Sequence, residues 1–428
     1  MDIKILAKSC LTKLVDAGVD LASVSVINSQ KHELQKDYDV ISLSRNTDEI
    51  SIQLRVIDDQ REGTQAFNYT SDADIDTYIA KVVETAKNSK QDKAFAMAEN
   101  TVESKSFGAT TPDLDLMYSL LDAFIKEKDE KYPEIKDTST IFFESSHSYT
   151  LNNKGVELEF KNGYYGAVSI FTAVRDAKSS SLNYTFNVIP ELPEALMKVG
   201  RFEQVFQETI EQIDQKIFDD KFEGEVILSP EAVGFCVQMM LAELGGLDLV
   251  NKTSKFQDDL HKKVFHEKLT LKATPMNPDL AIKALANQEG FLYKEDYIIK
   301  NGVINSFFVN QYVANKTGLE RTDLSPSPAI IENGDTKFED MVKGIKKGIL
   351  INRISGGNPN KNKDFSAIAK NSYYIEDGKI LYPINEVMVT ANIINMLQNI
   401  IEVSQETLNF GESIVPWIKC AGVTVSGK

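Results

Sequence analysis

The strongest constraint on the fold is a set of short stretches in which apolar and polar residues alternate, separated by tight turns. In residues 50–56, apolar side chains occupy every second position, which is the period of a β-strand with one buried face. Asn301-Gly302 and Asp377-Gly378 each lie between two such apolar segments. These dipeptides are typical of two-residue hairpin turns, because both central residues of a type I′ turn need positive φ. The pattern therefore predicts antiparallel hairpins.

Helical patterns interrupt the strands at irregular intervals. Apolar residues recur with helical spacing in four predicted helices, at residues 3–15, 71–87, 113–131 and about 194–216. We also predict turns at residues 46–48 and at Asn162-Gly163, inside the β-like segments 41–70 and 139–188. Because strands and helices do not alternate regularly, we predict an α+β class rather than a doubly wound sheet.

The length of 428 residues allows two or three domains. We predict an N-terminal α/β domain with an antiparallel sheet at residues 1–218, with a subdivision near the polar segment 91–112. A C-terminal β-rich domain with a barrel-like mixed sheet is predicted for residues 219–428. The helix predicted at residues 230–244 lies in this second domain.

Charge excludes several classes of partner. The chain carries 47 basic and 63 acidic residues, which gives a net charge of −16. Nucleic-acid binding needs a basic surface that displaces counterions, and an anionic membrane surface selects for the same charge. We therefore expect neither nucleic acid nor a membrane as a partner, and the negative charge weakly favours basic peptides.

The three cysteines, Cys10, Cys236 and Cys420, are few and far apart, which argues against a disulfide scaffold. The first residues lack the basic and apolar regions of a signal peptide, and the apolar window 233–250 is interrupted by polar residues and glycines. The expectation is a cytoplasmic protein in which each cysteine is a small buried apolar residue.

Residues 225–246 form the most informative stretch, because a short strand leads directly into a helix. Ser229 is a suitable N-cap, and Pro230 suits the first helical position. Val233, Val237 and Met240 are spaced as a buried stripe, so an ordinary core helix explains the periodicity. Glu231 would then be a residue that the helix dipole favours in the first turn.

The same stretch resembles the TldD/PmbA family, also called modulator of DNA gyrase proteins. In the TldD branch this helix carries an H-E-x-x-x-H motif that binds a catalytic metal. Here Glu231 and Gly234 remain, while Pro230 and Phe235 replace both histidines, as in the PmbA (TldE) branch. The resemblance extends over nearly the whole chain through weaker motifs, which include residues 151–156, 273–275, 296–308 and 363–366.

The replaced histidines imply that this chain holds no metal. A catalytic zinc needs about three protein ligands, and neither proline nor phenylalanine has a donor atom in its side chain. The cysteine that the TldD branch supplies near its C-terminus is also missing, since residues 408–412 contain none. His261 and His266 form the only close histidine pair, and we favour a solvated loop there because lysines surround them. We expect no catalytic, cofactor-binding or metal-binding residue, only the relict motif Pro230, Glu231, Gly234 and Phe235.

The resemblance implies a two-subunit cytoplasmic metallopeptidase that degrades small or unfolded peptides and matures precursors. This chain would be the inactive subunit, a TldD-type partner would bring the zinc, and the two would enclose a chamber. Peptide would bind by strand addition to an exposed sheet edge. Two alternatives remain open: a self-associating binding or regulatory protein, which fits a homodimer in isolation, and an active peptidase with an unrecognised metal site. Phosphate-loop, dinucleotide-binding and nucleophile-elbow motifs are absent from the sequence.

Overall fold

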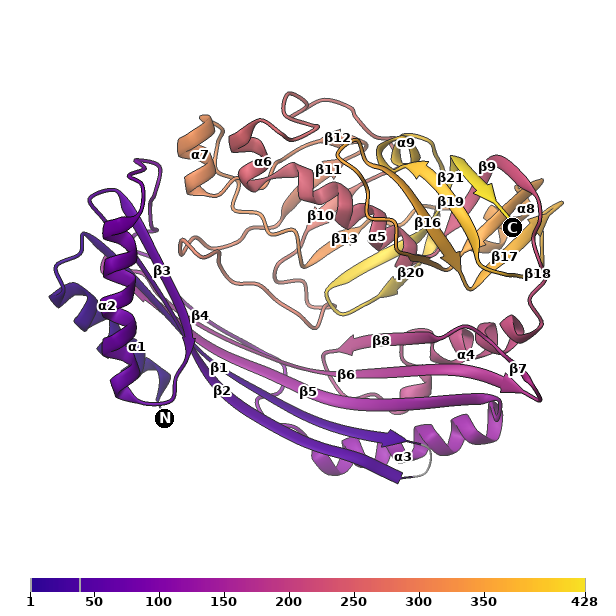
Figure 1. Ribbon diagram of the computed structural model, residues 1–428, viewed down its shortest axis with the longest axis horizontal. Coiled ribbons are helices and arrows are strands. Elements are labelled where there is room, and N and C mark those ends of the chain that lie inside the picture. The colour runs from indigo at the N-terminus through magenta and orange to yellow at the C-terminus, as the bar shows by residue number, and fades with distance from the viewer. Residues whose placement is uncertain (1, 38–39, 428) are drawn as a thin grey trace.

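The computed structural model describes residues 2–37 and 40–427, and within them the strands form two sheets. Strands β1 to β8 make an antiparallel, strongly curved sheet, to which β4 alone is joined in parallel. Strands β9 to β21 make a mixed sheet. Figure 1 shows the curved sheet below and the second sheet above its concave side. The predicted α+β class is confirmed.

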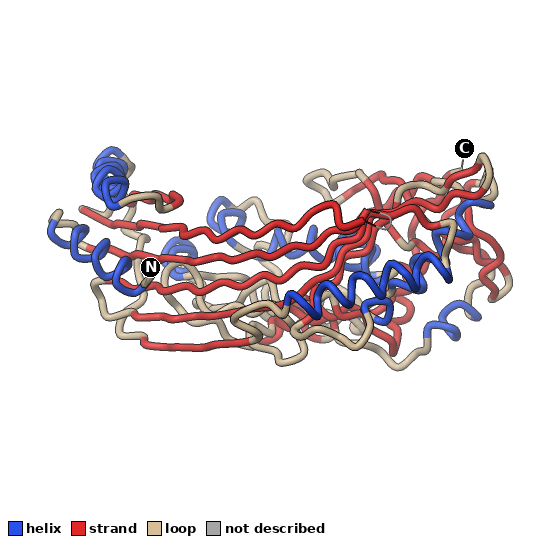
Figure 2. The backbone as a smooth tube through the Cα atoms, turned by 90° about the horizontal axis from the view of Figure 1, so that it is seen from below, coloured by secondary structure: helices blue, strands red, loops and turns tan. Residues whose placement is uncertain are grey.

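The N-terminal sheet has the order β3-β2-β1-β5-β6, and both β4 and β8 lie along the far side of β6. Its elements are α1 (Ile3–Asp16), β1 (Leu21–Asp37), β2 (Val40–Asp58), β3 (Arg61–Asn68), α2 (Asp72–Asn88), β4 (Val102–Phe107), α3 (Leu114–Lys131), β5 (Ile135–Asn152), β6 (Glu157–Arg175), β7 (Lys178–Ser179), β8 (Asn183–Ile189) and α4 (Phe202–Glu211). In Figure 2 the long strands lie side by side along the whole length of the sheet.

Helices cover one face of this sheet at two separate places. Along β1, Val24 and Val26 pack under α1 and α2, whereas Leu34 reaches the cluster under α3 and α4. Between these clusters the same face carries Asn28 and Gln30, which donate hydrogen bonds to Asp48. The opposite, concave face therefore remains available to the C-terminal part of the chain.

The C-terminal sheet surrounds the largest apolar cluster, which contains much of α5. Its elements are β9 (Lys221–Leu228), α5 (Pro230–Leu241), α6 (Gly246–Asn251), β10 (Leu271–Ala273), β11 (Asp296–Lys300), β12 (Val303–Ile304), α7 (Gln311–Thr317), β13 (Ala329–Ile331), α8 (Phe338–Lys343), β14 (Lys347–Ile351), β15 (Arg353–Ser355), β16 (Asp364–Lys370), β17 (Ser372–Glu376), β18 (Lys379–Ile384), β19 (Val387–Asn392), α9 (Ile393–Gln398), β20 (Ile400–Asn409) and β21 (Ser413–Ser426). The hairpins predicted at Asn301-Gly302 and Asp377-Gly378 are β11–β12 and β17–β18.

Three local predictions are wrong. Residues 46–48 continue β2, because Asn46 pairs with His32 of β1 where the sheet face is polar. Asn162-Gly163 lies inside β6, and its glycine allows close approach, since a Cβ there would lie 1.8 Å from the carbonyl oxygen of Ala109. The helix predicted at 194–216 is only α4, because Gly200 adopts a φ of 56° just before it.

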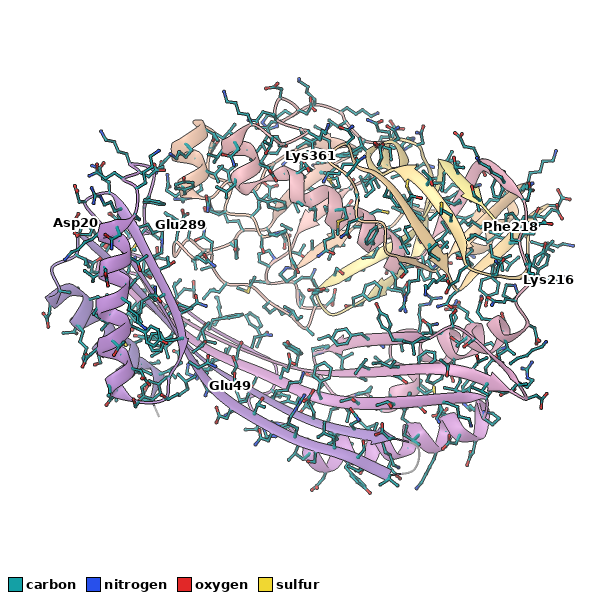
Figure 3. All side chains as sticks on the ribbon, in the orientation of Figure 1. Asp20, Glu49, Lys216, Phe218, Glu289 and Lys361 are labelled. Carbon is teal, nitrogen blue, oxygen red and sulfur yellow. The ribbon has the colours of Figure 1, made fainter. Side chains whose placement is uncertain are left out.

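The two parts of the chain touch at several points. Lys316 of α7 forms an ion pair with Asp92, with a 2.5 Å Nζ–Oδ2 distance. The backbone carbonyl of Glu289 accepts a 2.8 Å hydrogen bond from the amide of Ala98, and Figure 3 places Glu289 on the side that faces the N-terminal part. Among the described helices, none is long and apolar enough to cross a membrane.

We expect Lys128→Met to destabilise the N-terminal part strongly. Lys128 on α3 forms a 2.7 Å ion pair with Asp137 of β5, and the two side chains are 2% and 0% exposed. Removing the cation leaves a buried carboxylate, which costs about 3–5 kcal/mol of unfolding free energy. Urea denaturation measures the change.

Lys126→Met is the matched control on the same helix. Lys126 is 71% exposed and pairs with Asp122, so water and salt screen this pair and its loss should change the unfolding free energy little. Equal losses for the two variants would contradict a special role for the buried pair.

Candidate functional site

The site is organised by the first turn of α5. Strand β9 ends at Leu228, and Ser229 then caps the helix by accepting a 3.3 Å hydrogen bond from the amide of Ala232. The same hydroxyl donates a 2.7 Å bond to the carbonyl of Asn352, the residue after β14. Pro230 takes the first helical position, as its missing N–H allows. This double anchoring fixes the direction in which Glu231 leaves the helix.

The residues at the motif positions do not fit a metal ion. Pro230 is buried, and Phe235 packs edge-on against Phe365 with 6.5 Å between ring centroids. Neither side chain has a donor atom. Within residues 2–37 and 40–427, no group of three His, Cys, Asp or Glu side chains is placed to hold a metal.

The three cysteines are not suited to bind a metal ion either. All three are free and at most 1% exposed, so their predicted burial is confirmed. Burial raises the pKa of Cys236 to about 12 and that of Cys10 to about 11. Metal binding needs a thiolate, which such an apolar setting disfavours. His266 accepts a hydrogen bond from the amide of Lys268 in an exposed turn.

Glu231 has a definite partner. Its carboxylate accepts two hydrogen bonds from Arg201 Nη1, at 3.3 and 3.2 Å. Arg201 is the N-cap residue of α4, and its side chain is only 6% exposed. The other terminal nitrogen of Arg201 donates a 2.7 Å bond to Glu208 of the same helix. One guanidinium therefore bridges carboxylates from the two parts of the chain.

Glu208 is the most perturbed acid of this cluster. Its carboxylate also accepts bonds from Gln204 at 2.8 Å and from Asn352 at 3.0 Å. Burial raises the pKa of Glu208 to about 7; the cation of Arg201 lowers the pKa, and the negative charge of Glu231 raises it further. The desolvation of this carboxyl group therefore outweighs its favourable contacts.

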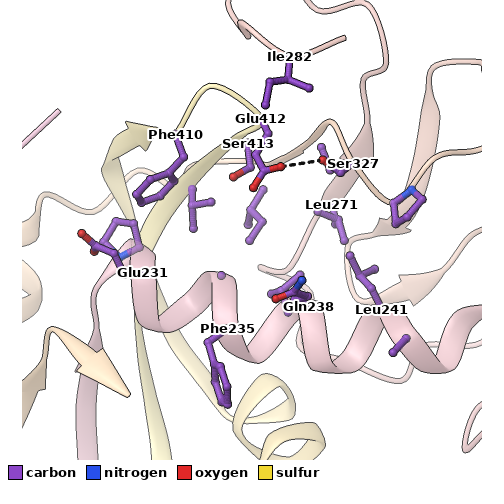
Figure 4. Close-up of a pocket in the computed structure, with 18 of the residues that line it drawn as sticks. Glu231, Phe235, Gln238, Leu241, Leu271, Ile282, Ser327, Phe410, Glu412 and Ser413 are labelled. Atoms are coloured by element: carbon purple, nitrogen blue, oxygen red, sulfur yellow. Dashed lines mark hydrogen bonds between the residues drawn. The ribbon is translucent and has the colours of Figure 1, made fainter. Parts of the chain in front are cut away.

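A cavity of about 1120 Å3 lies beside this cluster, between α5 and the concave face of the N-terminal sheet. Its walls are largely apolar and come from distant parts of the chain. Figure 4 shows Leu241 of α5, Leu271 of β10 and Phe410 of the turn between β20 and β21 among the residues that line it. Tyr184, Phe186 and Val188 line it from β8.

Carboxylates dominate the charged lining of this cavity. Four acidic side chains line it, namely Glu144, Glu231, Asp248 and Glu412, against the single basic residue Arg353. Arg353 stacks on the ring of Tyr184 at 3.6 Å, and burial lowers its pKa. Negative charge next to apolar walls suits a ligand that combines apolar and basic groups.

The edge of β8 borders the cavity. The amide of Tyr184 bonds to the side chain of Asn183, and its carbonyl accepts a 2.9 Å bond from Arg353. Both groups therefore point away from β6. Since backbone direction alternates along a strand, the N–H and C=O groups of Phe186 point the same way. Among the described residues, neither group has a hydrogen-bond partner.

Sequence reasoning found the motif helix but not most of this site. Arg201, Tyr184, Phe186 and Glu412 were not predicted to take part. The alternation of Leu182, Tyr184, Phe186 and Val188 was a usable signal for a one-sided strand, but it does not tell an edge strand from a central one. Because the chain has 63 acidic residues, its sequence gives no reason to select a carboxylate such as Glu412 as a site residue.

Comparison with known proteins gives a family for the C-terminal part. Residues 222–427 match the model of the PmbA/TldA metallopeptidase C-terminal domain. The Metalloprotease PmbA homolog of Buchnera aphidicola is 25% identical over 262 residues, which cover 60% of this chain and 57% of that protein. The first curated relatives are matched over 41–57% of their own length, about half.

Two solved structures share the fold over nearly the full length. A proposed modulator of DNA gyrase from Bacteroides thetaiotaomicron is 22% identical, with a TM-score of 0.86 and 99% of each chain covered. TldE from Thermococcus kodakarensis is 20% identical, with a TM-score of 0.82 and coverage of 99% of this chain and 100% of the other. At these identities the likeness establishes the fold alone.

The pKa of Glu208 predicts a pH-dependent stability. In the unfolded chain this carboxyl group titrates near its ordinary value of 4.5, and in the folded chain near 7. The folded state then binds more protons between these values, so the unfolding free energy falls as the pH rises from 4.5 to 7. Glu208→Gln removes this contribution, and urea denaturation across that pH range measures it.

Glu203→Gln provides the control for that series. Glu203 is on the same helix, and its side chain is 52% exposed. This variant is expected to keep the wild-type slope of stability against pH. A Glu208→Gln protein with an unchanged slope would refute the assignment to Glu208.

Proposed function

From the match of residues 222–427 to the PmbA/TldA metallopeptidase C-terminal domain, we propose that the chain is the metal-free subunit of a two-chain peptidase of the PmbA/TldD family. In this proposal it belongs to the PmbA/TldE type. A TldD-type partner brings zinc, and the complex cleaves small or unfolded peptides in the cytoplasm. The three unpaired cysteines support a reducing compartment.

One observation carries the proposal of a metal-free subunit. Pro230 and Phe235 occupy the motif positions on α5, and Phe235 is committed to packing against Phe365. Glu231 is engaged by Arg201, so it does not stand ready to act on a water molecule. A chain of this kind contributes binding surface and leaves bond cleavage to its partner.

The cavity beside α5 supports a peptide as the ligand. Its volume of about 1120 Å3 exceeds the range of about 300–1,000 Å3 typical of small-molecule pockets. The unpaired backbone groups of Phe186 can hydrogen-bond an extended chain, which depends on backbone rather than side-chain identity. The rings of Tyr184 and Phe186, each 49% exposed, offer packing area to the side chains of that peptide.

A self-associating binding protein is the second candidate. Strand β3 pairs with β2 only from Ser51 onward, so among the residues that the structure describes no strand covers the outer edge of β2 over residues 40–49. Figure 3 shows Glu49 on this outer strand. An uncovered edge of this length is a template for pairing with another chain.

Mixing experiments separate the two candidates. We expect the purified chain to hydrolyse no peptide with or without added zinc, and a TldD-type chain from the same organism to gain hydrolysis when the two are mixed. A chelator is expected to abolish that activity. Hydrolysis is followed with a fluorogenic unfolded peptide, and co-elution on gel filtration reports the complex.

A Pro230→His/Phe235→His variant serves as the control, and it is expected to remain inactive alone because no third ligand is at hand. Chelator-sensitive hydrolysis by the unmixed wild-type chain would refute the metal-free role. A chain that self-associates and adds nothing to a TldD-type partner would favour the second candidate.

Strand addition at β8 has a separate test in the isolated chain. An eight-residue peptide is methylated on the backbone nitrogens of either its odd or its even positions. Only one set faces β8 in a given register, so blocking that set should weaken binding about tenfold, the equivalent of roughly 1.4 kcal/mol. Fluorescence anisotropy measures both affinities.

The other methylated peptide is the internal control and should bind nearly as well as the parent. Equal affinities for the two methylated peptides would show that backbone pairing is not used. Phe186→Ala, which keeps the backbone groups, should weaken both peptides equally.

A further inference from the structure

Within the described part of the chain, Glu412 has no cationic partner, whereas two other carboxylates of the cavity, Glu231 and Glu144, each have one. It lies in the turn between β20 and β21, and its side chain accepts only a long 3.5 Å bond from Ser327 Oγ (Figure 4). Among the described residues, no lysine, arginine or histidine lies within ion-pair distance of it. Glu231, in contrast, is neutralised by Arg201 at 3.2 Å.

Tyr164 and Glu144 of the concave sheet face lie close to Glu412. The hydroxyl of Tyr164 donates a 2.6 Å hydrogen bond to Glu144 Oε2. The pKa of Tyr164 is raised, first by burial and then by the bond and charge of Glu144, and the charge of Glu412 adds to the effect. Two carboxylates and one aromatic ring therefore share a corner of the cavity.

The surroundings of this corner are apolar. Phe410 belongs to the same turn as Glu412, the amide of Ile282 donates a 2.9 Å hydrogen bond to the carbonyl of Gly411, and both Ile282 and Val188 line the cavity. The turn also closes the end of the β8 edge, because a Cβ on Gly411 would lie 2.6 Å from the carbonyl oxygen of Val188. A long basic side chain matches such a place, since its methylene stem packs on apolar surface while its head reaches the carboxylates.

We propose that Glu412, Glu144 and Tyr164 form a subsite for one lysine or arginine side chain of a peptide lying along β8. This inference rests on the proposed function in that it takes the cavity as the peptide site. Glu412 supplies the uncompensated charge, and Glu144 shares its own charge with Lys31 at 2.9 Å. The ring of Tyr164 also lines the cavity, and aromatic rings attract cations.

The other charged groups agree with a cation rather than an anion. Arg353 is occupied by the ring and carbonyl of Tyr184, so it does not neutralise Glu412. The net charge of −16 raises the local concentration of basic peptides around the molecule. An acidic peptide side chain in this corner would face two like charges.

The test compares neutral host peptides that differ at one position, which carries lysine, norleucine or glutamate. Norleucine has the carbon chain of lysine without the charge. With the isolated chain we expect lysine to bind about tenfold more tightly than norleucine at one position of the host, and glutamate more weakly than both. The advantage of lysine should shrink as salt rises.

Variants then assign the preference to Glu412. Glu412→Gln should reduce the ratio of lysine to norleucine affinity to about threefold or less, and Glu412→Lys should make the glutamate peptide the best ligand. Glu203→Gln removes a carboxylate of α4 that is 52% exposed and does not line the cavity, and it should keep the wild-type ratio.

Wild-type ratios near one at every position, or a ratio that Glu412→Gln leaves intact, would overturn the subsite. Such a result is independent of the mixing assay, in which hydrolysis of neutral peptides still tests the peptidase role. Conversely, a mixture without hydrolysis defeats the proposed function while the binding ratios still decide the subsite. An isolated chain that binds none of these peptides also overturns the subsite, and the mixing assay still decides the peptidase role.

Discussion

The contact on which the site depends is the buried guanidinium of Arg201. It joins Glu208 on α4 to Glu231 on α5, and it lies 5.8 Å from the centroid of the Trp417 ring on β21. Three elements from the two parts of the chain thus meet at one cation. A buried charge is tolerated only when it is paired, so none of these elements can shift without exposing an unpaired group. Glu231, which lines the cavity, is held in place in this way.

This arrangement gives Glu231 a role that its position in the motif does not suggest. In the first turn of a helix a carboxylate is already favoured by the dipole. Its contact with Arg201 adds a second role, because it joins the N-terminal part of the chain, through α4, to the C-terminal part. The contacts of Glu231 are therefore explained by packing and charge, without any role in metal binding.

What could be predicted from the sequence was local. The turns at Asn301-Gly302 and Asp377-Gly378, and the capped start of α5 at Ser229, depend on neighbouring residues and were correct. The turn predicted at Asn162-Gly163 was wrong, because this glycine allows the close approach of Ala109, which is distant in the sequence. The free edge at Phe186 and the isolation of Glu412 depend on strand order and on chain segments more than 200 residues apart, so no local pattern contains them.

Gly234 leaves the surface of α5 under the cavity free of side-chain atoms. A glycine inside a helix costs about 1 kcal/mol relative to alanine. At Gly234 a Cβ would meet nothing within 4 Å, so no packing constraint demands the glycine. The residue lines the cavity, where a bare backbone leaves the most room above the helix. The proposed peptide role gives a reason for this glycine, because the methyl group of an alanine would project into the space that a bound peptide would occupy.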